Sequence, residues 1–343
     1  MATTEETKSL FDKLMHDQEK TSKRCFCFQA IYSLRGVILA LVTGILFASA
    51  TTMVTLAERR NVHVFQICVI AYACLFVISA ILSCVIRTQL CTQGKRDTAI
   101  MMVMGVTRWS SIVLAYYAFE YTQVGNVTAV VRGITPVLTS VLAFMFLHET
   151  VTIAEIVITT ISIIGVLLVA APSFIFKYTN VNGYDFQFPP DEAKPVIGYT
   201  LAIACGIIFS LTCLFARSLP KDGSAACRFI YDSLVGFILS VIFLYTLSPE
   251  PPVWSMSTLD AMSFTAYSVL DAIAIFTLYV SFQFELASTV SMLLNIEVVA
   301  SYIFQTTILQ SPPMIYQIIG AAVIILCSVL IAFIKWRQHK NDQ

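Results

Sequence analysis

A segment near the start of this chain is repeated 162 positions further on. Residues 36–47 read GVILALVTGILF, and residues 198–209 read GYTLAIACGIIF. Six of these twelve positions are identical: Gly36/Gly198, Leu39/Leu201, Ala40/Ala202, Gly44/Gly206, Ile45/Ile207 and Phe47/Phe209. About one identity would be expected by chance in so apolar a chain. The same shift pairs Tyr117 with Tyr279 and Val137 with Val299, which predicts a tandem duplication with one constant register.

The two copies are too apolar to form soluble domains. The chain is 57% hydrophobic and 12% charged, whereas a soluble domain has about 25% charged residues. The charges gather at the two ends and in a few short connections. We therefore expect an integral membrane protein that contacts the lipid bilayer directly. The formal net charge is zero, which gives no support to nucleic-acid binding.

The fold class that we expect is an all-α integral membrane protein, because a span needs about 20 mostly apolar residues. Ten windows qualify: 36–57, 64–86, 98–118, 125–147, 152–171, 196–216, 228–248, 259–281, 286–308 and 313–335. The longest inner connection, 172–195, is rich in Pro and Asn and lies between the two copies. The expected organisation is an N-terminal tail (1–35), a first repeat (36–171), this linker, a second repeat (196–335) and a C-terminal tail (336–343).

The distribution of Lys and Arg predicts the orientation, because cytoplasmic connections carry an excess of these residues. Fifteen lie in the two tails and in the connections on their side, against four on the other side. We therefore expect both termini in the cytoplasm, with the 172–195 linker on the opposite side. The tail shows no obvious retrieval signal, which favours the plasma membrane slightly over the Golgi or endoplasmic reticulum.

Five spans in each copy is an odd number, so the second copy must enter the membrane from the opposite face. The ten helices would then form two inverted five-helix repeats. Inverted repeats around a site at the membrane midplane are a recurring architecture of secondary transporters, in which the two halves rock between outward-open and inward-open states.

Three local patterns resemble the drug/metabolite transporter superfamily, of the EamA-like kind and close to solute carrier family 35. Span four ends in a Pro…Leu-His-Glu segment, span nine contains Asn-Ile-Glu-Val, and spans five and ten carry a Gly-containing pattern: Thr135-Pro136-Val137 with Phe146-Leu147-His148-Glu149, Asn295-Ile296-Glu297-Val298, Ile164-Gly165-Val166 and Ile319-Gly320-Ala321. The resemblance implies solute transport without ATP hydrolysis. It also implies a cavity among helices one to four and six to nine, with helices five and ten at the periphery.

Ionisable groups deep in the predicted spans indicate where a binding site would lie, because such groups are costly in a membrane. Arg108, Arg132, Asp271 and Glu297 lie well inside spans three, four, eight and nine, whereas Asp232 lies near the end of span seven, where its side chain could reach the interface. Polar residues at helical spacing accompany the deep charges. The candidate substrate-binding residues are Arg108, Arg132, Thr128, Thr135, Ser111, Tyr117, Tyr267, Asn295 and Ser291.

Two interpretations of the deep charges stay open. Arg108 and Arg132 could bind an anionic solute, because guanidinium stays charged when desolvated and forms paired hydrogen bonds to carboxylate or phosphate. Alternatively, Arg132 pairs with Glu297 and Arg108 with Asp271 in a neutral bundle core. Asp271 and Glu297 could also carry a proton through a transport cycle. At the constant shift of 162, Leu270 and Leu294 stand opposite the two arginines.

The function expected from these patterns is a secondary transporter that moves a small organic anion by alternating access. The anion would be a dicarboxylate, tricarboxylate or phosphorylated metabolite, with a proton or counter-anion as the coupling partner and a homodimer as one assembly to consider. Two alternatives are a nucleotide-sugar transporter of the secretory pathway and a non-transporting membrane regulator. The sequence contains no phosphate-binding loop, Cys/His cluster or hydrolase triad pattern, so we expect neither an enzyme nor a cofactor or metal site.

Overall fold

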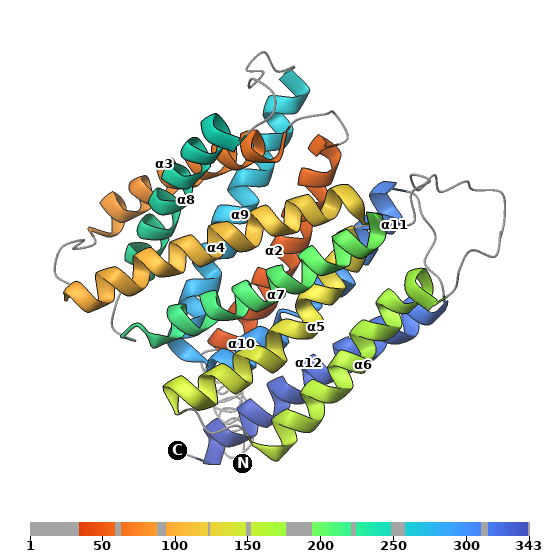
Figure 1. Cartoon of the computed structure of the whole chain (residues 1–343). Helices are drawn as coiled ribbons and strands as arrows, with labels where there is room; N and C mark the ends of the chain where they lie inside the picture. Colours follow the sequence, from red (N-terminus) through yellow and green to blue (C-terminus); the bar gives the residue numbers. More distant parts are fainter. Residues whose placement is uncertain are drawn as a thin grey trace, which may run out of the picture.

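The computed structural model describes residues 34–58, 63–87, 94–122, 124–148, 152–175, 194–220, 224–247, 258–309 and 315–341. Most of the predicted tail 1–35 and of the linker 172–195 therefore lies outside the described residues. The described part is helical (Figure 1). The helices are α2 (Arg35–Glu58), α3 (Val64–Ile86), α4 (Lys95–Tyr121), α5 (Val124–Leu142), α6 (Ile153–Ile175), α7 (Lys194–Ser218), α8 (Ala225–Leu247), α9 (Thr258–Phe284), α10 (Ala287–Leu293), α11 (Ile296–Leu309) and α12 (Ile315–Asn341).

The helices coincide with the apolar windows of the sequence. Within the described residues, eight segments are long and apolar enough to cross a membrane. The apolar parts of α6 and α12, Ile153–Leu168 and Ile318–Ile331, are shorter, so the number of ten spans stays a prediction. The helix α12 continues to Asn341, and residues 336–341 thus extend the last helix, whereas we expected them to form a separate tail.

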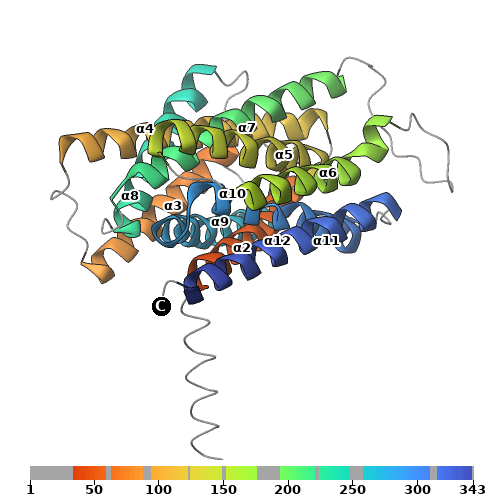
Figure 2. The same cartoon turned by 90° about the horizontal axis from the view of Figure 1, so that it is seen from below.

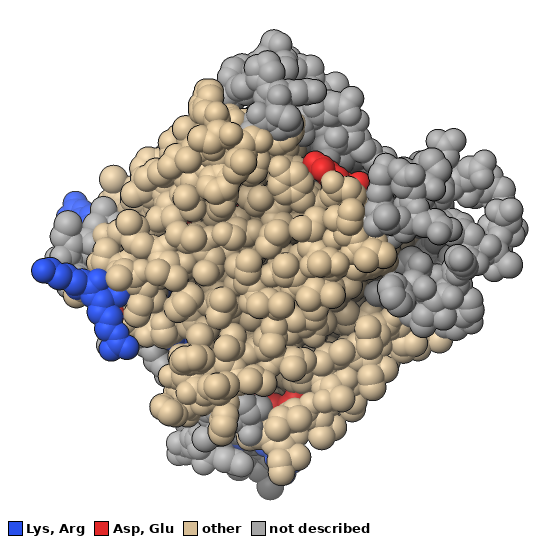
Figure 3. Space-filling view, in the orientation of Figure 1, with Lys and Arg blue, Asp and Glu red and all other residues tan. Residues whose placement is uncertain are grey.

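The exterior of the molecule matches an apolar environment. Large hydrophobic side chains such as Val77, Ile81, Phe146 and Leu326 are more than half exposed. The face in Figure 3 is almost entirely free of charge, and most of its Lys and Arg surface lies at one edge. This is the surface expected of a protein whose sides contact lipid.

The two halves of the chain pack their helices in the same pattern, so that exchanging the halves leaves the helix contacts unchanged. The helix α2 packs along α9, and its counterpart α7 packs along α4. The helix α3 packs on its own counterpart α8, and α6 packs on α12. Figures 1 and 2 show the α3–α8 pair and the α6–α12 pair at opposite sides of the molecule. This places α6 and α12 at the periphery, as the family resemblance implies.

The two glycines at corresponding positions of the repeated segment, Gly44 and Gly206, each lie close to the fourth helical segment of the other half. A side chain on Gly44 of α2 would lie 2.5 Å from Cγ2 of Ile296, and one on Gly206 of α7 would lie 3.4 Å from Cβ of Ile134. Ile134 and Ile296 are themselves 162 positions apart. The repeated glycine therefore permits close packing of the first helix of one half on the fourth helical segment of the other.

The ends of corresponding helices in the two halves are displaced by different amounts. Those of α2 and α7 differ by 159 and 160 positions, those of α3 and α8 by 161, and those of α4 and α9 by 163. Helix ends vary by one or two residues between corresponding elements, so the constant shift of 162 stays a prediction.

The fourth helical segment differs between the halves. In the first half α5 continues through Pro136 and ends in a π-helix, Ala143–Leu147. In the second half the window expected as one span, 286–308, is divided into α10 and α11 at Leu294 and Asn295. Hydrogen bonds between residues three apart carry the chain through this break, from the Asn295 N–H to the Met292 carbonyl and from the Glu297 N–H to the Leu294 carbonyl.

Candidate functional site

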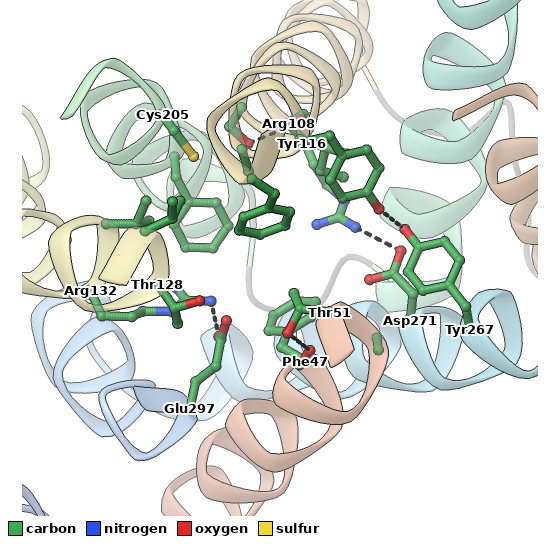
Figure 4. Close-up of a pocket in the computed structure, with 18 residues that line it drawn as sticks. Phe47, Thr51, Arg108, Tyr116, Thr128, Arg132, Cys205, Tyr267, Asp271 and Glu297 are labelled. Carbon is green, nitrogen blue, oxygen red and sulfur yellow. Dashed lines mark hydrogen bonds and ion pairs between the residues drawn. The ribbon is translucent and has the colours of Figure 1, made fainter. Parts of the chain in front are cut away.

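A cavity lies among six of the helices, in the middle of the molecule. It encloses about 680 Å³ of empty space, including open volume at its mouth. Its walls come from α2, α4, α5, α7, α9 and α11 (Figure 4). Apolar and aromatic side chains form most of the wall, and four ionisable groups interrupt them: Arg108, Arg132, Asp271 and Glu297. These are the four deep charges that the sequence singled out.

Arg132 and Glu297 form an ion pair at one side of the cavity. The Arg132 Nη2 donates to Oε2 of Glu297, and both side chains are more than nine-tenths buried. The guanidinium carbon of Arg132 lies 4.8 Å from the ring centroid of Phe209 and 5.7 Å from that of Phe47. These two rings are the phenylalanines of the repeated segment. They supply a cation–π environment that helps to hold a buried guanidinium.

Part of the Arg132 guanidinium has no hydrogen-bond partner. Its Nε and Nη1 atoms are buried and donate to no acceptor within the described residues. An unpaired buried donor on a charged group costs free energy. An acceptor that enters the cavity would remove this cost, and a planar carboxylate or phosphate matches the fork of a guanidinium.

Arg108 lies between two carboxylates at the other side of the cavity. Its Nε is 3.0 Å from Oδ2 of Asp232, and its Nη2 is 3.3 Å from Oδ2 of Asp271. The Phe47 ring lies between the two arginines, 5.9 Å from the guanidinium carbon of Arg108 (Figure 4). Both sequence interpretations thus meet in one place, because each arginine has a carboxylate partner and also lines the cavity.

Arg108 and Asp271 lie on corresponding helices of the two halves. Arg108 is in the middle of α4, and Asp271 is in the middle of α9. Each of these helices thus carries one charged group at its centre, the two groups have opposite sign, and they contact each other.

The position of Asp232 near a helix end suggested that its side chain could reach the membrane interface. In the structure the side chain is instead buried at the site. The residue is 0% exposed. The close approach of α4 and α8 explains this position, since a side chain on Gly105 of α4 would lie 2.9 Å from Cβ of Val235. The glycine brings the third turn of α8 against α4, so Asp232 faces Arg108. No periodicity in the sequence indicates this contact.

Five of the nine candidate substrate-binding residues line the cavity. They are Arg108, Arg132, Thr128, Ser111 and Tyr267. The Tyr267 hydroxyl forms a hydrogen bond with the Tyr116 hydroxyl, between α9 and α4. The pair covers the Arg108–Asp271 contact on one side (Figure 4).

The other four candidates do not line the cavity, because other contacts hold their side chains. Tyr117 packs edge-on against the ring of Phe65 on α3. The Thr135 hydroxyl donates to the Val131 carbonyl, and the Ser291 hydroxyl to the Ser288 carbonyl. The Asn295 amide donates to the Ser162 hydroxyl of α6, at 2.7 Å.

Several residues of the cavity wall were not among the predicted substrate-binding residues, because they are apolar or small and do not belong to a row of polar side chains along a helix. Phe47 and Phe209 belong to the repeated segment, so their identity in both copies was a signal that could have identified them. Cys205 of α7 and Thr51 of α2 also face the cavity. No group of His, Cys, Asp and Glu suited to a metal ion occurs in the part of the chain that the structure describes.

Comparison with known proteins places this site in a family context. The sequence profile of the EamA-like transporter family matches residues 34–171 and again residues 196–333. Solute carrier family 35 member G1 of Homo sapiens is 24% identical over 309 residues, which are 89% of this chain and 81% of that protein. The Mus musculus protein of the same name is 23% identical over 306 residues, 88% of this chain and 79% of its own.

A solved crystal structure has the same fold, with a TM-score of 0.67 at 14% identity, and it covers 88% of this chain and 98% of its own. The two profile matches fall on the two copies that the repeated segment predicts. The resemblance drawn from the sequence motifs is confirmed. This chain is a multi-pass integral membrane protein, and it belongs to the EamA-like transporter family.

Proposed function

We propose that this protein is a secondary transporter that moves a small organic anion, such as a di- or tricarboxylate or a phosphorylated metabolite, by alternating access. The observation that carries the proposal is the pair of buried arginines in one cavity, with Nε and Nη1 of Arg132 bonded to no acceptor in the part of the chain that the structure describes. An anion can accept from these atoms while Glu297 keeps Nη2. No catalytic step forms part of the proposal.

The architecture supports alternating access through two inverted five-helix repeats. The packing of helices is the same when the halves are exchanged. Figure 1 shows α2 and its counterpart α7 crossing the molecule in opposite directions. In this proposal all ten predicted segments span the membrane, and the repeats exchange conformations to move the opening of the cavity from one side to the other.

The position of the cavity along the helices defines which side is open. Its wall residues lie in the C-terminal halves of α2 and α4 and in the N-terminal halves of α5 and α9. Successive helices alternate in direction, so these halves lie on the same side. In this proposal both termini are cytoplasmic, so the cavity opens toward the outside and the state is outward-facing. The plasma membrane is the proposed location.

Uptake into liposomes tests the proposal directly. The purified full-length chain is reconstituted and offered radiolabelled succinate, citrate, inorganic phosphate and a phosphorylated sugar, with and without a pH gradient. We expect saturable uptake of one anion class, and loss of that uptake in an Arg132→Gln, Glu297→Gln double variant, which removes both charges of one ion pair and leaves no unpaired buried charge. Arg96→Gln is the matched control, because Arg96 is an exposed arginine on the same helix as Arg108.

Undiminished anion uptake by the double variant would contradict the anion site. A second candidate substrate is a nucleotide sugar, because the aromatic residues Tyr116, Phe119 and Tyr267 line the cavity and could stack on a base. Including UDP-glucose in the panel separates the two, since uptake of this compound alone would favour the nucleotide-sugar transporter.

A further inference from the structure

The buried ionisable groups of the site are unequal in number. Arg132 and Glu297 form a balanced pair. Arg108, in contrast, is the single cation between Asp232 and Asp271. If all three groups of this second cluster were ionised, they would carry one net negative charge. Burying an uncompensated charge costs several kcal/mol even after the surroundings relax.

We propose that the cluster of Asp232, Arg108 and Asp271 binds one exchangeable proton, and that this proton enters the transport cycle together with the anion. The coupling part of this inference rests on the proposed anion transport. The proton site itself rests on the geometry of the three side chains. With one proton bound, the cluster is neutral and the cavity no longer opposes the entry of an anion.

Among the described residues, the groups that face the two carboxylates supply no cation besides Arg108. Asp232 is faced by Arg108 from α4, by Tyr279 and Asp271 from α9, and by Tyr72 from α3.

Asp271 is faced by Arg108, by the hydroxyls of Tyr116 and Tyr267, and by Glu297, whose charge is balanced by Arg132. The described residues contain no group suited to a metal ion. A proton is therefore the ligand that fits the cluster.

Burial assigns different roles to the two carboxylates. Asp232 is 0% exposed, lies outside the cavity wall and is the nearer partner of Arg108. The side chain of Asp271 is 7% exposed and lines the cavity. We therefore assign the exchangeable proton to Asp271, which water in the cavity can reach, and the permanent negative charge to Asp232. The proton comes from water in the cavity and forms an O–H bond on the Asp271 carboxylate. No other covalent bond of the side chain changes.

The proton and the anion should bind with positive cooperativity. A dianion attracted to Arg132 adds negative charge to a cavity that already contains Asp271. A proton on Asp271 removes part of that repulsion, and by linkage the anion favours the same proton. If protonation is obligatory, the apparent affinity for the anion rises about tenfold each time the pH is lowered by one unit. This holds as long as the pH is above the pKa of Asp271.

Two variants distinguish the proton site from a merely structural cluster. Asp271→Asn copies the charge of the protonated side chain, and Asp232→Asn leaves Arg108 and Asp271 as a balanced pair. Neither leaves an unpaired buried charge, so we expect both to fold. The matched control is Asp97→Asn, at the first turn of α4 and outside the cavity.

The first measurement reads the proton without any transported solute. Infrared difference spectra of the reconstituted full-length chain are recorded between low and high pH. We expect the wild type and Asp97→Asn to lose a protonated-carboxyl band on raising the pH, and Asp271→Asn and Asp232→Asn to lack this change. Identical difference spectra for the wild type and Asp271→Asn would overturn the proton site.

The second measurement reads the coupling, with succinate and inorganic phosphate as probes and a pH-sensitive dye trapped in the vesicles. We expect net uptake by the wild type to acidify the lumen, and both Asn variants to exchange internal for external anion without acidification. Wild-type uptake that moves no proton would overturn the coupling. If the infrared change is present and no anion of the panel is transported, the proposed function fails while the proton site stands.

Discussion

Arg108 and Asp271 lie in the middle of α4 and α9, which are corresponding helices of the two halves, and they form an ion pair with each other. The distance between Nη2 and Oδ2 is 3.3 Å. Because the two helices correspond, this contact lies close to the axis that relates the halves. We therefore expect the pair to persist in both states of a transporter built from inverted repeats.

Removal of the shared cation should destabilise the fold. Arg108→Gln leaves Asp232 and Asp271 buried without a positive partner, which we expect to cost about 3–5 kcal/mol and to lower the thermal unfolding midpoint in detergent. The triple variant Arg108→Gln, Asp232→Asn, Asp271→Asn should unfold near the wild-type temperature, because it removes all three charges together. A midpoint for Arg108→Gln equal to that of the wild type would contradict the paired arrangement.

The geometry of Arg132, beyond its charge, should matter for uptake. Arg132→Lys keeps the positive charge but replaces a planar fork with a point charge, and it gives up the stacking on Phe209. We expect the apparent KM for the transported anion to rise about tenfold, a loss of about 1.4 kcal/mol of binding. Arg132→Gln should abolish uptake. Initial-rate measurements in liposomes check both, and equal KM values for the Arg132→Lys variant and the wild type would remove the argument from geometry.

Cys205 should report on the cavity, because it is the cysteine among the described residues that lines it. We expect a small, charged, membrane-impermeant methanethiosulfonate reagent, applied from the open side, to inhibit uptake through this residue. A transported anion should slow the reaction by occupying the same space. The variant Cys205→Ala serves as the control and should be insensitive. Inhibition that persists in this variant would place the reactive thiol elsewhere.

Gly236 should tolerate no larger residue. A side chain on this residue of α8 would lie 2.0 Å from Cε1 of Tyr72, whose ring is buried. We expect Gly236→Ala to cost about 1–3 kcal/mol through overpacking, seen as a lower unfolding midpoint. The comparison is Gly133→Ala, where the nearest neighbour outside its own helix turn, Cγ1 of Val166, would be 3.4 Å away. Equal midpoints for the two variants would contradict the close packing of α3 on α8.

All of the charged candidates of the sequence analysis line the cavity, whereas only some of the polar ones do. A charged side chain in an apolar span has few tolerable positions, because it must avoid lipid. The cavity is accordingly lined by all four deep charges: Arg108, Arg132, Asp271 and Glu297. Serine and threonine hydroxyls can donate to a carbonyl of their own helix. Thr135 and Ser291 do so, and their helical spacing with charged residues therefore did not determine where they point.

The sequence by itself determined the helices, the duplication and the deep charges. A helix that spans a bilayer needs a long apolar segment, and each charged residue within it costs free energy, so both features are visible in the sequence. Only the tertiary structure decided which charges meet. One residue of shift turns a helix by about 100°, so a shift measured on one repeated segment does not by itself determine which side chains of distant helices meet. Asp232 became a partner of Arg108 because Gly105 lets two helices approach closely, and such an approach leaves no periodic trace in the sequence.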